Sequence, residues 1–204
     1  HIEIISHGRA ETALRRCDVA LLFLDALRDV GNVDKRLAGM IRREHKACVV
    51  VANKWDLVGD GMTVEQYAEY VQKLLPSLSF CPILGVSAKD GFHDHTTIKM
   101  AYELHGQSLV RVSTGQLNRA LSGAIELRRP KAIKNRIGKI YFGTQIATNP
   151  VTILLFVNYP ELFPGAYRRF LEGQMRKRLP WGEIPIKLCF RGRETLKKRG
   201  RGLG

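Results

Sequence analysis

Long hydrophobic runs and paired cysteines are missing from this sequence of 204 residues. Its apolar runs, such as residues 19–24 and 47–52, are far shorter than the roughly 20 residues that a membrane-spanning helix needs. Its four cysteines form no CxxC pair, which argues against a zinc knuckle and against the disulfide framework of a small secreted protein. We therefore expect a protein of the reducing cytoplasm that has no membrane as a partner.

Acidic residues are scarce in the second half of the chain. Residues 1–110 hold 13 Lys and Arg against 14 Asp and Glu, a net charge of −1, whereas residues 111–204 hold 20 against 5, a net charge of +15. The second half contains no Asp at all. An asymmetry this strong predicts that the second half binds a nucleic acid or another anionic surface. The alternative is that the basic residues only keep a small domain soluble.

The first half alternates short apolar runs with segments of helical spacing. The apolar runs at 19–24, 47–52 and 82–86 are typical of strands that are buried on both faces of a parallel sheet. Helical periodicity is found at 10–17, 33–45, 64–75, with Thr63 as its cap, and about 96–110. The pattern predicts an open α/β sheet with helices on both sides, and such sheets bind ligands at the carboxyl ends of their strands.

Two polar loops follow these strands. Asn53-Lys54-Trp55-Asp56 comes directly after the strand at 47–52, and Ser87-Ala88-Lys89 follows the strand at 82–86. An N-K-x-D tetrapeptide alone is weak evidence, because it occurs by chance in some chains of this length. The pair of loops is stronger evidence, since the carboxyl ends of neighbouring parallel strands meet at one edge of the sheet.

The residue types in these loops suit the recognition of guanine. The Asp56 carboxylate can accept two parallel hydrogen bonds from N1–H and N2–H of guanine, whereas adenine has no such pair of donors. We expect Lys54 to lay its aliphatic stem along the base and Asn53 to tie the two loops together. The backbone N–H of Ala88 is expected to donate to the guanine O6. The alternative is that Asp56 is only a turn carboxylate and Ser87 only a helix cap.

The second half has the pattern of a small α+β domain. We expect a helix at 112–127 capped by Thr114, a hairpin of strands at 137–147 and 151–158 around a turn at 148–150, a helix that begins after Pro164, and a strand at 184–190. These elements predict a three-stranded sheet backed by helices.

Several stretches of the chain resemble the EngA/Der family of GTPases. Residues 34–39 (DKRLAG) and 53–57 (NKWDL) are similar to the second of that family's two tandem GTPase domains. Residues 158–163 (NYPELF), 167–170 (YRRF) and 190–194 (FRGRE) are similar to its KH-like C-terminal domain. The resemblance implies a partial P-loop GTPase-type parallel sheet with flanking helices at 1–110, a KH-like domain at 111–195 and a basic tail at 196–204.

The same resemblance implies a function. The family consists of GTP-hydrolysing factors that are needed for assembly of the large ribosomal subunit, so the expected ligands are GTP or GDP with Mg²⁺. The expected partners are the large ribosomal subunit or its precursor and its ribosomal RNA, with a monomer acting in the cytoplasm in association with ribosomes. The residues that match the family's base-binding motifs are Asn53, Lys54, Asp56, Ser87, Ala88 and Lys89.

The motifs that bind phosphate are absent from the sequence. No G-x-x-x-x-G-K-[ST] phosphate loop occurs, and the one D-x-x-G, at 56–59, reuses the Asp assigned to guanine. The chain also begins with His1 rather than Met. From these observations we expect a C-terminal fragment that lacks the catalytic residues, which therefore remain unknown, and that is inactive alone.

The basic half also lacks the G-x-x-G loop with which RNA-binding KH domains clamp a nucleic-acid backbone. Contacts to phosphates without base readout fit its composition better. The candidates on the expected helix after Pro164 are Arg168, Arg169, Arg176 and Lys177, with a solvated helix face as the alternative reading. Six aromatic residues are expected to pack in the core rather than to stack on bases: Tyr141, Phe142, Phe156, Tyr159, Phe163 and Trp181.

Two hypotheses of function remain open from the sequence. The first is a GTPase whose nucleotide state governs docking on ribosomal RNA. The second is an RNA- or protein-binding module in which the nucleotide loops are vestigial. The presence of both N-K-x-D and S-A-K favours the first, and a phosphate loop followed by D-x-x-G upstream in the reading frame would discriminate the two.

Overall fold

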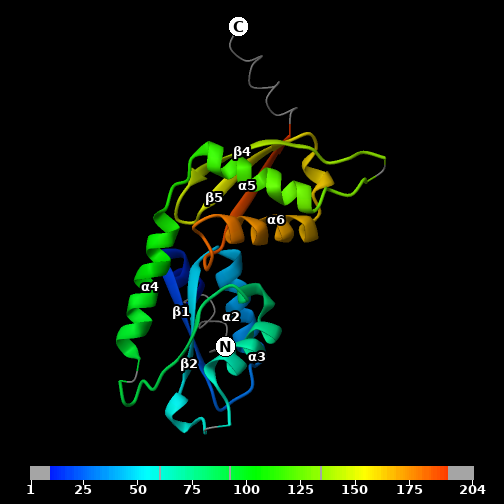
Figure 1. The fold of residues 1–204 in the computed structure, drawn as a ribbon. Coiled ribbons are helices and arrows are strands. Elements are labelled where there is room, and N and C mark those ends of the chain that lie inside the picture. Colours follow the sequence, from blue (N-terminus) through cyan, green and yellow to red (C-terminus); the bar gives the residue numbers. More distant parts are fainter. Residues whose placement is uncertain (1–9, 60, 92, 134, 193–204) are drawn as a thin grey trace. The chain divides into compact units, whose positions relative to one another are not determined.

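The computed structural model describes residues 10–59, 61–91, 93–133 and 135–192 (Figure 1). The chain divides into two compact units, one formed by His1–Ser108 with Glu183–Pro185 and the other by Leu109–Gly182 with Ile186–Gly204. The tail expected at 196–204 lies outside the described residues. No helix in the described part of the chain is long and apolar enough to cross a membrane.

The first unit is built on a parallel three-stranded sheet. Strands β1 (Val19–Asp25), β2 (Ala47–Asn53) and β3 (Ile83–Gly85) lie in the order β1-β2-β3, and both neighbouring pairs are parallel. Six of the seven residues of β2 are buried, because it is the central strand. The expected α/β fold is therefore confirmed.

Helices flank this sheet. Residues 10–16 are helical, followed by α2 (Asn32–Arg43), α3 (Val64–Leu74) and α4 (Asp94–Leu109), with short 3₁₀ turns η1 at Trp55–Leu57 and η2 at Pro76–Leu78. In Figure 1, α2 and α3 lie on one side of the sheet and α4 on the other. Thr63 caps α3 as expected, because its hydroxyl accepts from Gln66 N–H while the Gln66 side chain accepts from Thr63 N–H.

The second unit contains a mixed three-stranded sheet and two main helices. Its elements are α5 (Thr114–Leu127), β4 (Ile140–Ala147), β5 (Thr152–Val157), the 3₁₀ turn η3 (Pro160–Leu162), α6 (Gly165–Arg178) and β6 (Lys187–Gly192). The strand order is β4-β5-β6, with β4 antiparallel and β6 parallel to β5. This is the small α+β sheet that the sequence predicts, with helices packed against it (Figure 1).

Two local predictions in this unit are wrong. The cap of α5 is Ser113 rather than Thr114, because the Ser113 hydroxyl accepts from Gln116 N–H and completes a capping box that Thr114 cannot form. The last strand begins at Lys187 rather than at 184, since Ile184 is buried in a loop without pairing in the sheet. An apolar run indicates that its residues are buried, but buried residues occur in packed loops as well as in strands.

A close approach between α5 and β4 holds the second unit together. A side chain at Gly143 of β4 would place its Cβ 2.7 Å from Leu121 Cδ1 and 2.8 Å from Leu155 Cδ2, so any larger residue would force these leucine side chains to move. The Asn118 side chain of α5 binds this same residue twice, accepting from Gly143 N–H at 2.8 Å and donating to Gly143 O at 2.9 Å. The helix therefore packs directly on the strand's backbone.

We predict that Gly143→Ala lowers the free energy of unfolding of the second unit by about 1 to 3 kcal/mol, because the added methyl overpacks this contact. The matched control is Gly173→Ala in α6, where nothing lies within 4 Å of the added Cβ. This control should stabilise the unit by up to about 1 kcal/mol through higher helix propensity. Urea denaturation followed by the fluorescence of buried Trp181, in a Trp55→Phe background, measures both. Equal effects of the two substitutions would contradict the prediction.

Candidate guanine-binding site

The two polar loops meet at the carboxyl end of the sheet. Ala88 N–H donates to Asn53 Oδ1 at 3.1 Å, and Trp55 N–H donates to Val86 O at 2.9 Å. Asn53 thus ties the loops together, as expected from the sequence. The same bond occupies the Ala88 N–H that was expected to bind the guanine O6, so a base oxygen would have to share it or displace Asn53.

Packing of Trp55 fixes the position of the N-K-x-D loop. Its indole lies on Gly85 of β3, where a Cβ would come within 2.7 Å of Trp55 Cδ2. The indole also meets Tyr67 of α3 edge to face, with ring centroids 5.6 Å apart. The loop is therefore anchored on both the strand and the helix that surround it.

This anchoring leaves the Asp56 carboxylate open. Asp56 lies in the 3₁₀ turn that follows Lys54 and is exposed. Within the described part of the chain, its carboxylate has no hydrogen bond or ion pair with another side chain. A carboxylate held on a rigid turn without a protein partner fits a role as acceptor for the two donors of a guanine base.

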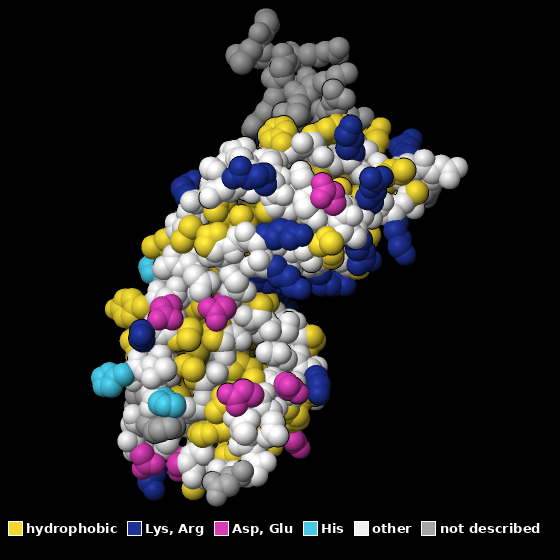
Figure 2. Space-filling view, in the orientation of Figure 1, with side chains coloured by type: hydrophobic (Ala, Val, Ile, Leu, Met, Phe, Trp, Pro, Cys, Tyr) yellow, Lys and Arg dark blue, Asp and Glu magenta, His cyan; other side chains and the backbone are white. Residues whose placement is uncertain are grey.

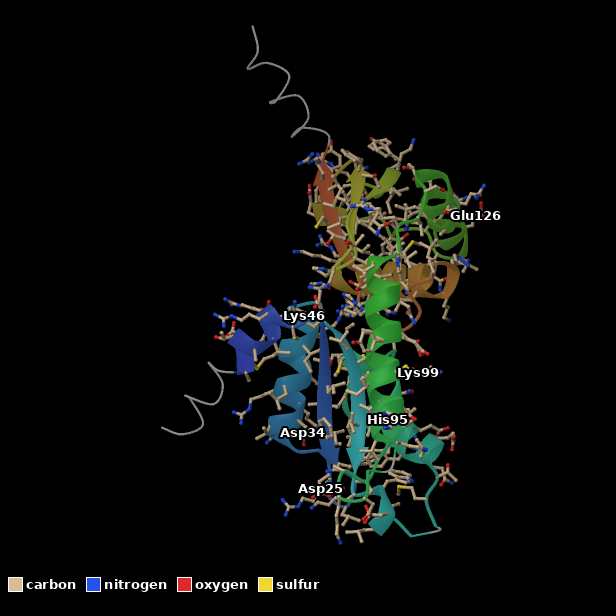
Figure 3. All side chains as sticks on the ribbon, turned by 90° about the vertical axis from the view of Figure 1, so that its left-hand side faces the viewer. Asp25, Asp34, Lys46, His95, Lys99 and Glu126 are labelled. Carbon is tan, nitrogen blue, oxygen red and sulfur yellow. The ribbon has the colours of Figure 1, made fainter. Side chains whose placement is uncertain are left out.

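A carboxylate that the sequence did not reveal holds Lys54. The backbone of Lys54 is left-handed, with φ 65° and ψ 33°, and its ammonium donates to Asp25 Oδ2 at 2.8 Å. Asp25 is the last residue of β1 (Figure 3) and pairs in register with Asn53 of β2. The signal that would have revealed it is its position at the carboxyl end of a predicted strand, next to the strand that carries N-K-x-D.

The Lys54 ammonium holds the pKa of Asp25 below its ordinary value. The hydrogen bond from Lys54 is the largest cause, the backbone N–H of Leu27 adds to it, and the nearby Arg28 guanidinium contributes least. The lowered pKa favours the ionised form of Asp25, and the hydrogen bond places the lysine stem between the ends of β1 and β2.

The S-A-K loop is shaped by Ser87. This residue is 1% exposed, and its hydroxyl donates to Asp90 Oδ2 at 2.8 Å while Asp90 N–H donates to Ser87 O. Ala88 and Lys89 follow it at the surface. Ser87 thus forms the turn rather than a direct contact surface for a ligand.

The described residues include no group of three or more His, Cys, Asp or Glu side chains placed to hold a metal ion. For Mg²⁺, which the family resemblance implies, this part of the chain offers no set of ligands. The geometry of the site fits a base.

The four basic candidates in α6 differ in their exposure to solvent. Arg168 is half buried, since its Nε donates to Phe163 O at 2.7 Å and its guanidinium lies 4.4 Å from the centroid of Phe190. Arg176 is also half buried, whereas Arg169 and Lys177 are exposed. On the face shown in Figure 2, Lys and Arg gather over the second unit, and Asp and Glu lie mainly over the first. Arg169 and Lys177 are thus the two candidates best placed to meet phosphates.

The expectation that six aromatic residues pack in the core is only partly right. Phe163 and Trp181 are fully buried, with exposed fractions of 1% and 0%. Tyr141, Phe142 and Tyr159 are exposed by 44%, 46% and 37%, which contradicts the prediction for these three. Tyr141 and Phe142 lie in β4 and Tyr159 follows β5, and their spacing in the sequence does not tell which face of the sheet the helices cover.

We predict that Lys54→Met raises the pKa of Asp25 toward its ordinary value, because the largest cause of its depression is removed. Because the pKa of Asp25 is lowered in the folded state, ionised Asp25 stabilises the protein above its unfolded-state pKa. This stabilisation is lost as the pH falls through the folded-state pKa. A ¹³C NMR titration of the Asp25 carboxyl measures the shift. Arg28→Met is the control and should leave most of the depression in place. Loss of the depression in the Arg28 variant alone would contradict this assignment.

Two family models match the chain. The elongation factor Tu GTP-binding domain matches residues 7–126, and the KH-domain-like C-terminal region of EngA bacterial GTPase enzymes matches residues 111–191. Among solved structures, Era in complex with MgGDPNP and a segment of 16S ribosomal RNA is similar over 88% of this chain and 66% of that chain, with a TM-score of 0.40 and 18% identity. Similarity at that level does not establish a shared function.

Curated relatives match nearly the whole chain. It is 38% identical to the GTPase Der of Rhodopirellula baltica over 96% of its own length, and 40% identical to the GTPase Der of a Sulfurihydrogenibium species over 97%. It spans 44% of the length of each of these relatives. The first family model covers more than half of the chain with a GTP-binding domain, and the second adds the KH-like region. The chain therefore belongs to the EngA/Der family of GTPases.

Proposed function

We propose that this chain forms the guanine-reading and RNA-docking part of a GTP-hydrolysing factor that acts in assembly of the large ribosomal subunit. The observation that carries the proposal is the pair of loops joined by the Asn53–Ala88 hydrogen bond, with the Asp56 carboxylate open beside it. The family membership supports GTP as the substrate. In this proposal the protein acts as a cytoplasmic, ribosome-associated monomer.

Guanine selection rests on Asp56. Its carboxylate accepts from N1–H and N2–H of guanine, and adenine would leave it without donors. A site built around such a group can discriminate against the wrong base by as much as ~10⁴ to 10⁵. Lys54 contributes its aliphatic stem as one wall for the base, because its ammonium is held by Asp25.

Hydrolysis requires groups that this sequence does not contain. Phosphoryl transfer depends on positioning and electrostatic stabilisation around the γ-phosphate, and the chain has no G-x-x-x-x-G-K-[ST] loop to provide them. In this proposal the 204-residue chain alone turns over no GTP. The RNA-binding module with vestigial nucleotide loops remains the second candidate, and this missing loop together with the charge of the second unit is the observation in its favour.

RNA docking is assigned to the basic second unit. Residues 111–204 carry a net charge of +15, and neutralising RNA phosphates releases counterions, which makes such binding favourable and dependent on salt. Arg169 and Lys177 on α6 are exposed and free to reach phosphates. Ribosomal RNA is the proposed target because the resemblance to the EngA/Der family implies it.

We predict that Asp56→Asn shifts the base preference from guanine toward xanthine. Xanthine carries an oxygen in place of the exocyclic amine of guanine, so an amide NH₂ restores a hydrogen bond there. Base contacts alone bind weakly, so saturation-transfer NMR with GDP and XDP is the suitable measurement. Glu65→Gln, an exposed neighbour that the site does not use, is the control. If the Asp56 variant keeps the wild-type preference for GDP over XDP, Asp56 does not read the base.

We further predict that Arg169→Glu with Lys177→Glu weakens binding to ribosomal RNA fragments of any sequence. Each phosphate that the variant no longer neutralises should flatten the slope of log K against log[salt] by about 0.7 to 0.9. The control is Lys35→Glu with Arg36→Glu on α2, which makes the same change in net charge at exposed positions of the first unit. Filter binding at several salt concentrations measures the slopes. An equal effect of both pairs would remove α6 from the proposed docking surface.

A further inference from the structure

The helices of the second unit cover one face of its sheet. A side chain at Gly143 of β4 would meet Leu155 of β5, and Leu155 lies opposite Phe190 of β6 in register, so these positions share one face. Helix α5 packs there through Leu121, and α6 packs there through Arg168, whose guanidinium lies over Phe190. In Figure 1, α5 lies along β4 and β5.

Two phenylalanines lie on the opposite face. Phe142 and Phe156 immediately precede or follow residues of the covered face, so strand alternation turns them away from the helices. They are partners in the β4–β5 register, and their rings stack with centroids 4.3 Å apart and planes 17° apart. Phe142 is 46% exposed and Phe156 is half buried. The sheet thus presents a stacked aromatic surface to solvent.

Cations gather at the same end of the sheet, where β4 begins and β5 and β6 end. Arg191 of β6 lies opposite one of the two phenylalanines in register. The Lys139 ammonium is 5.6 Å from the ring centroid of Tyr141, and the Arg136 guanidinium is 5.2 Å from that of Tyr159. None of the three strands contains Asp or Glu.

We propose that this surface binds unpaired nucleotides of an RNA, with bases stacked on the Phe142–Phe156 pair and phosphates held by the surrounding cations. We call it the aromatic platform, formed by Phe142, Phe156 and Arg191 on the open face, with Arg136, Lys139, Tyr141 and Tyr159 at the adjoining end of the sheet. The inference rests on the proposed docking to RNA and adds which part of the RNA is bound. It also assigns a role to aromatic residues that were expected in the core.

The chemistry of the platform selects this ligand class. Every base has a face that stacks on an aromatic ring, and cations beside the rings complement the phosphates. Bases in a duplex are already stacked on one another, so only unpaired nucleotides can use the platform. The lack of carboxylates in the strands disfavours a basic peptide, and the density of cations disfavours a purely apolar partner. The sequence has no G-x-x-G clamp in this unit, so the RNA would be held by stacked bases and by cations on its phosphates instead of by such a loop.

The test compares two RNAs on the 204-residue chain by fluorescence anisotropy: a labelled oligoadenylate of about 10 nucleotides and a blunt duplex of similar length, a size within the span of known single-strand sites. Phe142→Leu with Phe156→Leu keeps apolar volume but removes both aromatic faces. We expect this variant to bind oligoadenylate about tenfold more weakly, with the salt slope and the duplex affinity unchanged. Ile146→Leu, at an exposed residue of β4 outside the platform, should bind like the wild type.

Three results would count against the platform in different ways. If the double variant binds oligoadenylate as tightly as the wild type, the platform is wrong and docking through phosphates stands. If the wild type binds neither RNA, both the platform and the proposed docking fail. If sedimentation shows a wild-type dimer that the double variant breaks, the face is an interface between copies of the chain and the proposal is overturned.

A second measurement avoids any dependence on the variant's folding. An oligonucleotide that carries 5-iodouridine crosslinks to aromatic side chains that stack on it, and peptide mapping of the wild-type chain then locates the crosslink. We expect crosslinks at Tyr141, Phe142, Phe156 or Tyr159. Crosslinks confined to peptides of α6 would overturn the proposal. Circular dichroism of the double variant establishes separately whether it has kept the fold.

Discussion

The pairing of β2 with β3 is the constraint on which the candidate site depends. A single hydrogen bond such as that between Asn53 and Ala88 contributes about 0.5 to 1.5 kcal/mol net, too little to bring two loops together from 35 residues apart. The parallel register, with Ala52 opposite Gly85, already brings the two strand ends side by side. The buried strand β2 therefore positions the loops, and the Asn53 bond only fixes their final geometry.

In each unit a glycine allows a strand backbone to pack closely against side chains of neighbouring elements. At Gly85 the backbone of β3 comes against the indole of Trp55, and at Gly143 the backbone of β4 comes against Leu121 and Leu155. In both places a Cβ would fall closer than 3 Å to a side-chain atom. Since packed interiors are nearly incompressible, either glycine limits what evolution can change around it. The first glycine supports the N-K-x-D loop, and the second supports the contact between helix α5 and the sheet of the second unit.

The fold and the two loops could be predicted from the sequence because each has a local signal. Continuous apolar runs indicate buried parallel strands, and Thr63 with Gln66 forms a capping box within four residues. The contact between Asp25 and Lys54 had no such signal, because it depends on the register of two strands. The exposure of Phe142 could not be predicted from the sequence either. Side chains along a strand point alternately to the two faces of the sheet, and the placement of the helices decides which face is buried.

The structure shows where the cations of the second unit lie, which the net charge alone does not show. Several of its cations are held against aromatic rings: Arg128 lies over Phe170, Arg136 over Tyr159, Lys139 over Tyr141 and Arg168 over Phe190. A cation held in this way keeps its charge but has already lost rotamer freedom, so ordering it on a phosphate costs less. The Arg168 guanidinium donates hydrogen bonds to the backbone carbonyls of Phe163 and Pro160, and these bonds stabilise the fold. The cations of the proposed platform stand beside exposed rings, so positive charge and an exposed aromatic face lie close together there.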